Sequence, residues 1–232
     1  MRIWDIHPGY LSRASLLGEH RELHAVVSII LNNRKGYARH PETMRWRGCL
    51  DALAVRHGLL AEEMLLRGYR HLSPVPDGQG SSWPGVYIDP PGAQFAILEG
   101  KYQGTDQGRI PLPHTADRLW AQHKYSVLAR DPGLYGDIGR QAARLRGGAF
   151  FHDLARTLAE SLRDPPPQGR LMNALEHMWG YVSDLDPDRS GHPGTPAEFM
   201  TEIQQRSFRH GVRYLLESTA LSDLAYWASR RK

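Results

Sequence analysis

The sequence predicts an all-α protein in which a small helical domain with a long irregular Gly- and Pro-rich segment precedes a C-terminal helical bundle. Apolar residues recur at helical spacing in the first third of the chain. Glycine and proline then crowd residues 73–113, and from residue 112 onward every regular pattern is helical. We therefore expect two domains, 1–110 and 111–232, because 232 residues can form two small cores.

The first eight residues are more apolar than most chain ends. Ile3, Trp4 and Ile6 carry large side chains that need a core to cover them. We expect this terminus to pack down and to be ordered. A terminus held in this way can present a reactive amine.

The segment that follows predicts an amphipathic helix. Its apolar residues repeat at three, four and seven positions: Leu16, Leu23, Val26, Val27, Ile30 and Leu31. Glu19 and Glu22 share one face of this helix, and Arg21 stands beside Glu22. Taken alone, the Arg21–Glu22 pair fits a solvated helix surface, and only the surrounding sequence favours a functional role.

Basic residues concentrate in the first 47 positions. Eight basic and four acidic side chains lie there, an excess as large as the net charge of +4 of the whole chain. Such an excess is typical of a protein that binds a phosphate backbone, although many solvated surfaces share it. The loop 34–42 interleaves Tyr37 with basic residues, which suits a strand of nucleic acid. A polar connection with Tyr37 packed on the helix end explains this loop equally well.

Further helices are predicted from apolar spacing and from turn residues. Across 49–67 the inward positions are Leu50, Leu53, His57, Leu60 and Met64, and Gly68 is a natural helix end. Residues 73–113 have the composition of a binding loop or a linker. The bundle is predicted to contain helices at 115–130, 135–146, 151–163, 169–185, 197–217 and 221–231.

Composition and motifs exclude several classes of protein. The apolar stretches are too short to span a bilayer, and the first residues carry charges where a signal peptide needs an apolar block, so we expect a cytoplasmic protein without a membrane partner. Cys49 is the only cysteine in the sequence, which excludes an internal disulfide and a thiolate metal cluster. His20 and His24 share a helix face, but the sequence shows no third ligand, so we expect no metal site and no cofactor.

Four blocks of the first domain occur in a specific order: Met1–Trp4, Leu17–His24, Gly36–Thr43 and Arg67–His71. Together they resemble the pyrimidine-dimer DNA glycosylase family, whose founding member is the phage endonuclease V. The resemblance implies excision of ultraviolet-damaged pyrimidines from double-stranded DNA and nicking of the abasic strand. It also implies an N-terminal α-amine as nucleophile and a helix glutamate as the proton-handling group.

The resemblance places those roles on Met1 and Glu22. It places Arg2 and Arg21 at phosphate-contacting positions, and with the basic loop the expected DNA-binding set is Arg2, Arg21, Arg34, Lys35, Tyr37, Arg39, His40 and Arg45. This chain has Met1 where the phage enzyme exposes a threonine, and Ala25 where that enzyme has a basic residue. We expect the loop 34–47 to replace the missing phosphate contact.

The chemistry is sound without the resemblance. Terminal α-amines have pKa values of about 8, well below lysine, so an appreciable fraction is neutral and nucleophilic at physiological pH. The amine can attack a sugar C1′ as the base leaves, and the imine that forms acidifies the C2′ proton, which Glu22 can remove. One pair of groups therefore suffices for base excision and strand nicking by an abasic-site lyase.

The second domain carries a further resemblance. Its segments 119–125, 129–132 and 173–181 resemble a widespread bacterial helical domain of unknown function, which is associated with photolyase genes and with thiouracil-desulfidase-like proteins. It implies a role with nucleic acids or nucleobases in a bacterial, nucleoid-associated protein. The candidate site residues are His123, Lys124, Tyr125, Asn173, His177 and Tyr181.

Helical spacing predicts that His123 and His177 approach each other in the bundle. They belong either to a polar network inside the core or to a nucleobase-sized pocket. For the whole chain two other functions stay open: a non-catalytic nucleic-acid-binding module, and a glycosylase for a different modified base.

Overall fold

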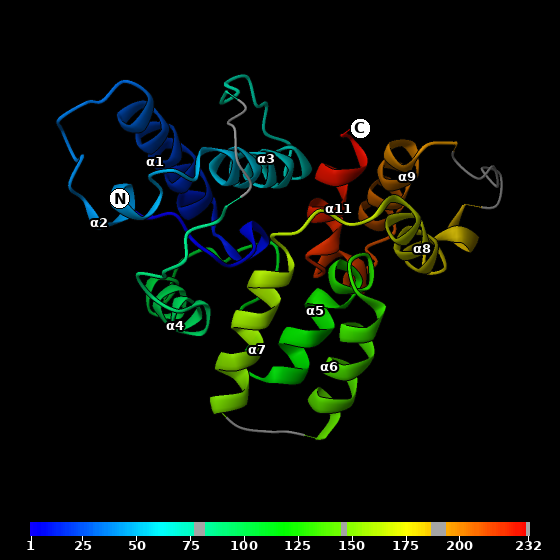
Figure 1. The fold of residues 1–232 in the computed structure, drawn as a ribbon. Helices are drawn as coiled ribbons and strands as arrows, with labels where there is room; N and C mark the ends of the chain where they lie inside the picture. Colours follow the sequence, from blue (N-terminus) through cyan, green and yellow to red (C-terminus); the bar gives the residue numbers. More distant parts are fainter. Residues whose placement is uncertain (77–81, 145–147, 187–193, 231–232) are drawn as a thin grey trace. The chain divides into compact units, whose positions relative to one another are not determined.

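The structure is a computed structural model and describes residues 1–76, 82–144, 148–186 and 194–230. Within these ranges the regular structure is entirely helical, which confirms the predicted all-α class (Figure 1). The chain divides into two compact units, Met1–Gly108 and Arg109–Lys232. In the described part of the chain no helix is both long and apolar enough to cross a membrane.

The helices of the first unit are η1 (Pro8–Tyr10), α1 (Arg13–Leu31), α2 (Pro41–Arg45), α3 (Leu50–Leu66) and α4 (Pro91–Lys101). The α1 helix begins after Ser12, whose hydroxyl accepts a hydrogen bond from the Ser15 N–H at 3.3 Å. The α3 helix ends at Leu66, and Gly68 follows with φ +81°, the left-handed conformation that glycine adopts at helix ends. The predictions for α1 and α3 are confirmed.

Two helices lie in segments that the sequence predicted to be irregular. The α2 helix interrupts the basic loop, and α4 occupies part of the Gly- and Pro-rich segment. Both helices have proline in the first turn, Pro41 in α2 and Pro91 in α4. Proline is favourable at that position, because its missing N–H would have no partner there and its fixed φ suits a helix. A high proline content was therefore a poor indicator of loop here.

A buried ion pair joins α1, α3 and the start of the chain. The guanidinium of Arg56 donates to both carboxylate oxygens of Glu19, at 2.7 and 2.8 Å, and also to the Ile6 carbonyl at 2.8 Å. The Glu19 carboxylate accepts a further hydrogen bond from the Trp4 N–H at 3.2 Å. Ile3, Trp4 and Ile6 are buried, so the prediction that the N-terminus packs down is confirmed.

The second unit is a helical bundle around α5. Its elements are α5 (Ala116–Leu128), α6 (Pro132–Arg144), α7 (Gly148–Ser161), α8 (Gln168–Trp179), η2 (Ser183–Leu185), α9 (Pro196–Arg209), α10 (Arg213–Leu216) and α11 (Ala220–Ala228). The α5 helix contacts α6, α7, α8 and α11. A buried ion pair between Arg130 and Asp223, with N···O distances of 2.8 and 2.9 Å, fixes the end of α5 against α11.

Two helices predicted in the bundle are shorter than expected. The helix predicted at 169–185 ends at Trp179 and is followed by η2. The helix predicted at 197–217 is divided into α9 and α10. Gly211 lies between these two helices with φ +62°, a left-handed conformation that ends the first helix.

We expect Arg56→Met to lower the free energy of unfolding by about 3–5 kcal/mol, because it leaves the buried Glu19 carboxylate without its cation. Urea unfolding followed by circular dichroism measures this loss. The double variant Glu19→Gln/Arg56→Met should lose less than the single variant, and Arg70→Met, at an exposed position, should change stability by less than about 0.5 kcal/mol. A single variant as stable as the wild type would contradict this account of the core.

Candidate functional site

The N-terminal amine lies beside a helix carboxylate. The Met1 nitrogen is 3.6 Å from Oε1 of Glu22, and the Arg2 N–H donates a hydrogen bond to Oε2 of the same carboxylate. The Met1 side chain is only 9% exposed, whereas the Glu22 side chain is 39% exposed. The terminus is therefore anchored by its side chain, and the carboxylate that meets its amine is accessible from solvent.

Contacts from α2 and α4 fix the position of this terminus. The Thr43 hydroxyl lies 3.6 Å from the Met1 sulfur. The Asp5 N–H donates to Gln94 Oε1 at 2.9 Å, and the Gln94 side chain donates back to Asp5 Oδ2 at 2.8 Å. Because both helices hold the first five residues, the amine has a defined place relative to Glu22.

Arg45 belongs to this supporting structure and not to a DNA-binding surface. Its side chain is 3% exposed. It donates to Glu42 at 2.7 Å, to Asp5 at 3.2 Å and to the Ile3 carbonyl at 2.9 Å. The sequence prediction that Arg45 contacts DNA is therefore wrong. The arginine lies in α2, which the sequence did not predict, and the helix turns it towards the chain terminus.

The other basic residues of the predicted set remain accessible. Arg21, Arg34, Lys35 and Arg39 are exposed. Arg2 is half-buried: its guanidinium lies 4.7 Å from the centre of the Trp4 ring and donates to Asp89 at 2.5 Å. A phosphate that bound Arg2 would have to displace this aspartate.

The aromatic residue of the basic loop points to solvent. Tyr37 is 70% exposed and has φ +56°, so it is not packed on the helix end. His40 accepts a hydrogen bond from the Glu42 N–H at 3.1 Å and thereby caps α2. Lys35, Tyr37, Arg39 and His40 line a shallow depression of about 630 Å³.

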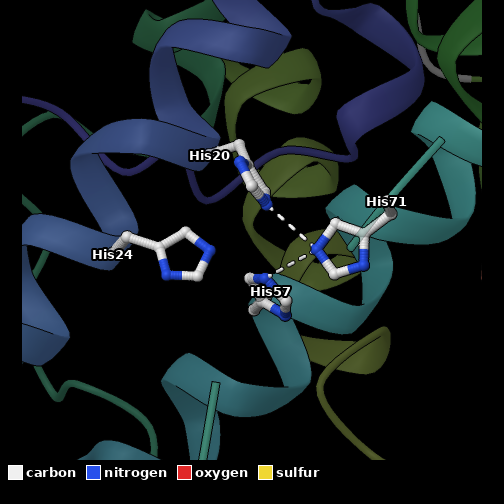
Figure 2. Close-up of side chains that lie close together, drawn as sticks. All are labelled: His20, His24, His57 and His71. Carbon is white, nitrogen blue, oxygen red and sulfur yellow. Dashed lines mark hydrogen bonds between the residues drawn. The ribbon is translucent and has the colours of Figure 1, made fainter. Parts of the chain in front are cut away.

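Four histidines form a cluster that the sequence analysis did not find. His20 and His24 of α1 meet His57 of α3 and His71, which follows α3, and their nearest ring nitrogens all lie within 4.8 Å of one another (Figure 2). The expectation that the α1 pair has no third partner is therefore wrong. One signal was present in the sequence, because His57 occupies an inward position among the apolar residues of α3.

Burial lowers the pKa values of three of these imidazoles, those of His20, His24 and His57. It lowers the pKa of His20 to about 4 and that of His57 to about 3, and the neighbouring histidines lower both values further by charge repulsion. The pKa of His24 is lowered by the same two causes. At neutral pH these rings therefore carry free lone pairs.

The structure separates the candidate residues of the second unit. His123 is buried, and its Nδ1 lies 2.9 Å from the Leu119 carbonyl. Asn173 and His177 are exposed on α8, so they do not belong to a polar network inside the core with His123. That part of the prediction is wrong because α8 turns Leu171, Leu175 and Met178, and not the polar residues, towards the core.

Lys124, Tyr125 and Tyr181 do come together, with Tyr214 as a fourth member that the sequence analysis missed. The Lys124 amine lies 4.9 Å from the centre of the Tyr125 ring and 4.6 Å from that of Tyr214. The rings of Tyr181 and Tyr214 stack at 5.0 Å. Burial, together with hydrogen bonds to the two other tyrosines, raises the pKa of Tyr125.

Comparisons with known proteins match each unit to a different family. Residues 1–77 match the family described as pyrimidine dimer DNA glycosylase. Residues 124–190 match the family described as protein of unknown function (DUF1722). No curated protein and no solved structure matches the chain. The two resemblances found in the sequence are confirmed, and the first match, which includes Met1 and Glu22, supports a pyrimidine-dimer-glycosylase-like role for the first unit.

We expect His123 to make the second unit sensitive to acid. Burial lowers the pKa of its imidazole to about 4 from the ordinary 6.5, against the opposing effects of Asp223 and the Leu119 carbonyl. The unfolded chain therefore binds this proton first as the pH falls. The contribution to stability is complete above pH 6.5, and about 3 kcal/mol is lost by about pH 4.

Urea unfolding between pH 4.5 and 7 tests this expectation. His123→Asn, which keeps a donor for the Leu119 carbonyl, should flatten the dependence, whereas the exposed His152→Asn should leave it unchanged. If the free energy of unfolding of the wild type and of His123→Asn fell equally with pH, this expectation would be contradicted.

Proposed function

We propose that the first unit is a DNA glycosylase with abasic-site lyase activity on ultraviolet-damaged pyrimidines, and that it acts through a Schiff base with the Met1 amine. The observation that carries this proposal is the contact of 3.6 Å between the Met1 nitrogen and the Glu22 carboxylate. The family match over residues 1–77 supports the type of reaction and a DNA substrate.

In the proposed first step Glu22 accepts a proton from the Met1 amine. The amine lone pair then forms a bond to C1′ of the damaged nucleotide as the bond from C1′ to the base breaks, and the base leaves with the electron pair. The leaving base takes up a proton from the ammonium that has formed at the Met1 nitrogen. The C1′–O4′ bond then breaks, O4′ keeps the electron pair and takes the proton back from Glu22, and a protonated imine forms between the Met1 nitrogen and C1′. The Glu22 side chain is 39% exposed and lies 3.6 Å from the amine, so a sugar that reaches this carboxylate from solvent also comes close to the nucleophile.

In the second step a carboxylate removes the C2′ proton that the imine has acidified. The electrons of that C–H bond form a double bond between C2′ and C3′, and the 3′ phosphate leaves with the electrons of the C3′–O bond. The Glu22 carboxylate lies 3.6 Å from the Met1 nitrogen and accepts a hydrogen bond from the Arg2 N–H, so we assign this step to it. Water then hydrolyses the imine and frees the amine.

The exposed basic residues of the first unit supply the proposed DNA contact. Arg21, Arg34, Lys35 and Arg39 can neutralise phosphates, and the exposed ring of Tyr37 offers a stacking surface to an unpaired base. Opening the duplex is less costly at a poorly stacked lesion, which favours damaged sites. We propose that the second unit influences the choice of damaged base.

We expect borohydride to trap a covalent adduct between the protein and irradiated duplex DNA, and mass spectrometry to map it to Met1. Acetylation of the terminal amine should abolish the adduct. Lys101→Met is the matched control, because this lysine lies 5.6 Å from the Trp4 ring and is a competing amine. An adduct on a lysine, or one that survives acetylation, would show that the nucleophile is misassigned.

We expect Glu22→Gln to retain the fold and DNA binding but to lose strand cleavage by at least about 100-fold, because glutamine cannot accept the proton. Single-turnover cleavage and binding of an uncleavable duplex measure the two properties separately. Equal losses of binding and cleavage would indicate a structural role for Glu22. Binding without cleavage by the wild-type protein, on every irradiated duplex, would favour the non-catalytic binding module.

We expect Arg39→Met to weaken binding to damaged and undamaged DNA alike and to reduce the slope of log K against log salt by about one contact. The exposed Arg140, which pairs with Asp137 in the second unit, provides the comparison variant Arg140→Met, whose slope should not change. Arg45→Met should instead lower the melting temperature, since it removes the cation that pairs with the buried carboxylates of Asp5 and Glu42. An unchanged salt dependence of binding for both Arg39→Met and Arg34→Met would show that this loop does not contact DNA phosphates.

A further inference from the structure

The histidine cluster joins three separate segments of the first unit. Figure 2 shows four imidazole rings that point towards one another from α1, from α3 and from the chain after α3. Nε2 of His71 lies 3.1 Å from Nε2 of His20 and 3.2 Å from Nε2 of His57. His24 completes the group, with its nearest ring nitrogen within 4.8 Å of the others.

These distances are close to those around a coordinated ion. Zn–N bonds of about 2.0–2.1 Å in a tetrahedron place neighbouring nitrogens about 3.3 Å apart. The two shortest separations in the cluster already have nearly this length. Small rotations of the side chains would bring the wider separations, at most 4.8 Å, to it.

Neutral imidazoles alone satisfy this arrangement poorly. Each neutral ring has one N–H, and its other nitrogen has one lone pair. Nε2 of His71 therefore cannot make a good hydrogen bond to Nε2 of His20 and to Nε2 of His57 at the same time. The Nε2 atom of His24 is buried and has no hydrogen-bond partner. Orphaned buried nitrogens are uncommon in folded proteins and require an explanation.

The surroundings of the cluster favour its use as a set of ligands. His20 and His57 are buried and His24 and His71 are half-buried, so much of the water is excluded from the ring nitrogens. Glu19, next to His20 in sequence, is fully engaged by Arg56. The backbone of Ser73 hydrogen-bonds to His24 and His57, which is how ligand histidines are commonly oriented.

We infer that His20, His24, His57 and His71 bind one divalent transition-metal ion, for which zinc is the best match. Imidazole nitrogens suit zinc, and four protein ligands close its tetrahedral coordination shell. Such a closed site has no position for a reacting water, so its role is to link α1, α3 and the chain after α3. The inference does not depend on the proposed glycosylase activity, which uses Met1 and Glu22.

The test uses the full chain without a histidine tag. After removal of metal with a chelator, calorimetric titration with Zn²⁺ alone should give one ion per chain, and saturation should raise the melting temperature by more than about 5 °C. Co²⁺ in place of zinc should give the intense visible absorption of a tetrahedral nitrogen site. His71→Gln and His57→Gln should each weaken zinc binding by at least about 100-fold, whereas His152→Gln, at an exposed position outside the cluster, should bind like the wild type.

The inference is overturned if the wild-type chain takes up no zinc, or if stoichiometric binding persists in both His71→Gln and His57→Gln. His71 is half-buried in an irregular segment, so its variant is expected to keep the helical circular-dichroism spectrum. Should either variant unfold, the cobalt spectrum of the wild-type chain decides alone: an octahedral spectrum, or none, rejects the site. Loss of zinc binding with intact strand cleavage would separate this site from the proposed function.

Discussion

The buried ion pair between Arg56 and Glu19 is the interaction on which the first unit depends. It joins two long helices, and through the Ile6 carbonyl and the Trp4 N–H it also holds the start of the chain. Two charges in a core are costly unless they are hydrogen-bonded. Here each of the three guanidinium nitrogens of Arg56 donates a hydrogen bond, and both carboxylate oxygens of Glu19 accept at least one. The result is a terminus whose amine is held beside Glu22 by the interior of the unit and not by a flexible surface contact.

The sequence predicted well what depends on local pattern. Regular apolar spacing located α1 and α3 to within a few residues, and the Ile3, Trp4 and Ile6 triplet indicated a packed terminus. The sequence analysis failed where the role of a residue depends on partners that are distant in the sequence. Nothing local distinguishes Arg45 from Arg39, yet the first is buried against Asp5 and Glu42, and the second is exposed.

The same reasoning explains the missed side-chain clusters. His20 and His71 are separated by 51 residues and Lys124 and Tyr214 by 90, so neither group forms a motif. Helical spacing alone also could not show which side of α8 faces the core. It brought His177 into a predicted interior network, whereas the larger apolar residues of that helix occupy the interior.

The buried ion pair and the histidine cluster use neighbouring residues on both α1 and α3. Glu19 precedes His20 on α1, and Arg56 precedes His57 on α3, so the ion pair and the histidine cluster share one pair of helix turns. A change in the separation of these turns acts on both groups at once. Glu22 lies three residues after Glu19 on α1, so one helix carries the carboxylate beside the Met1 amine, the buried partner of Arg56 and two of the clustered histidines.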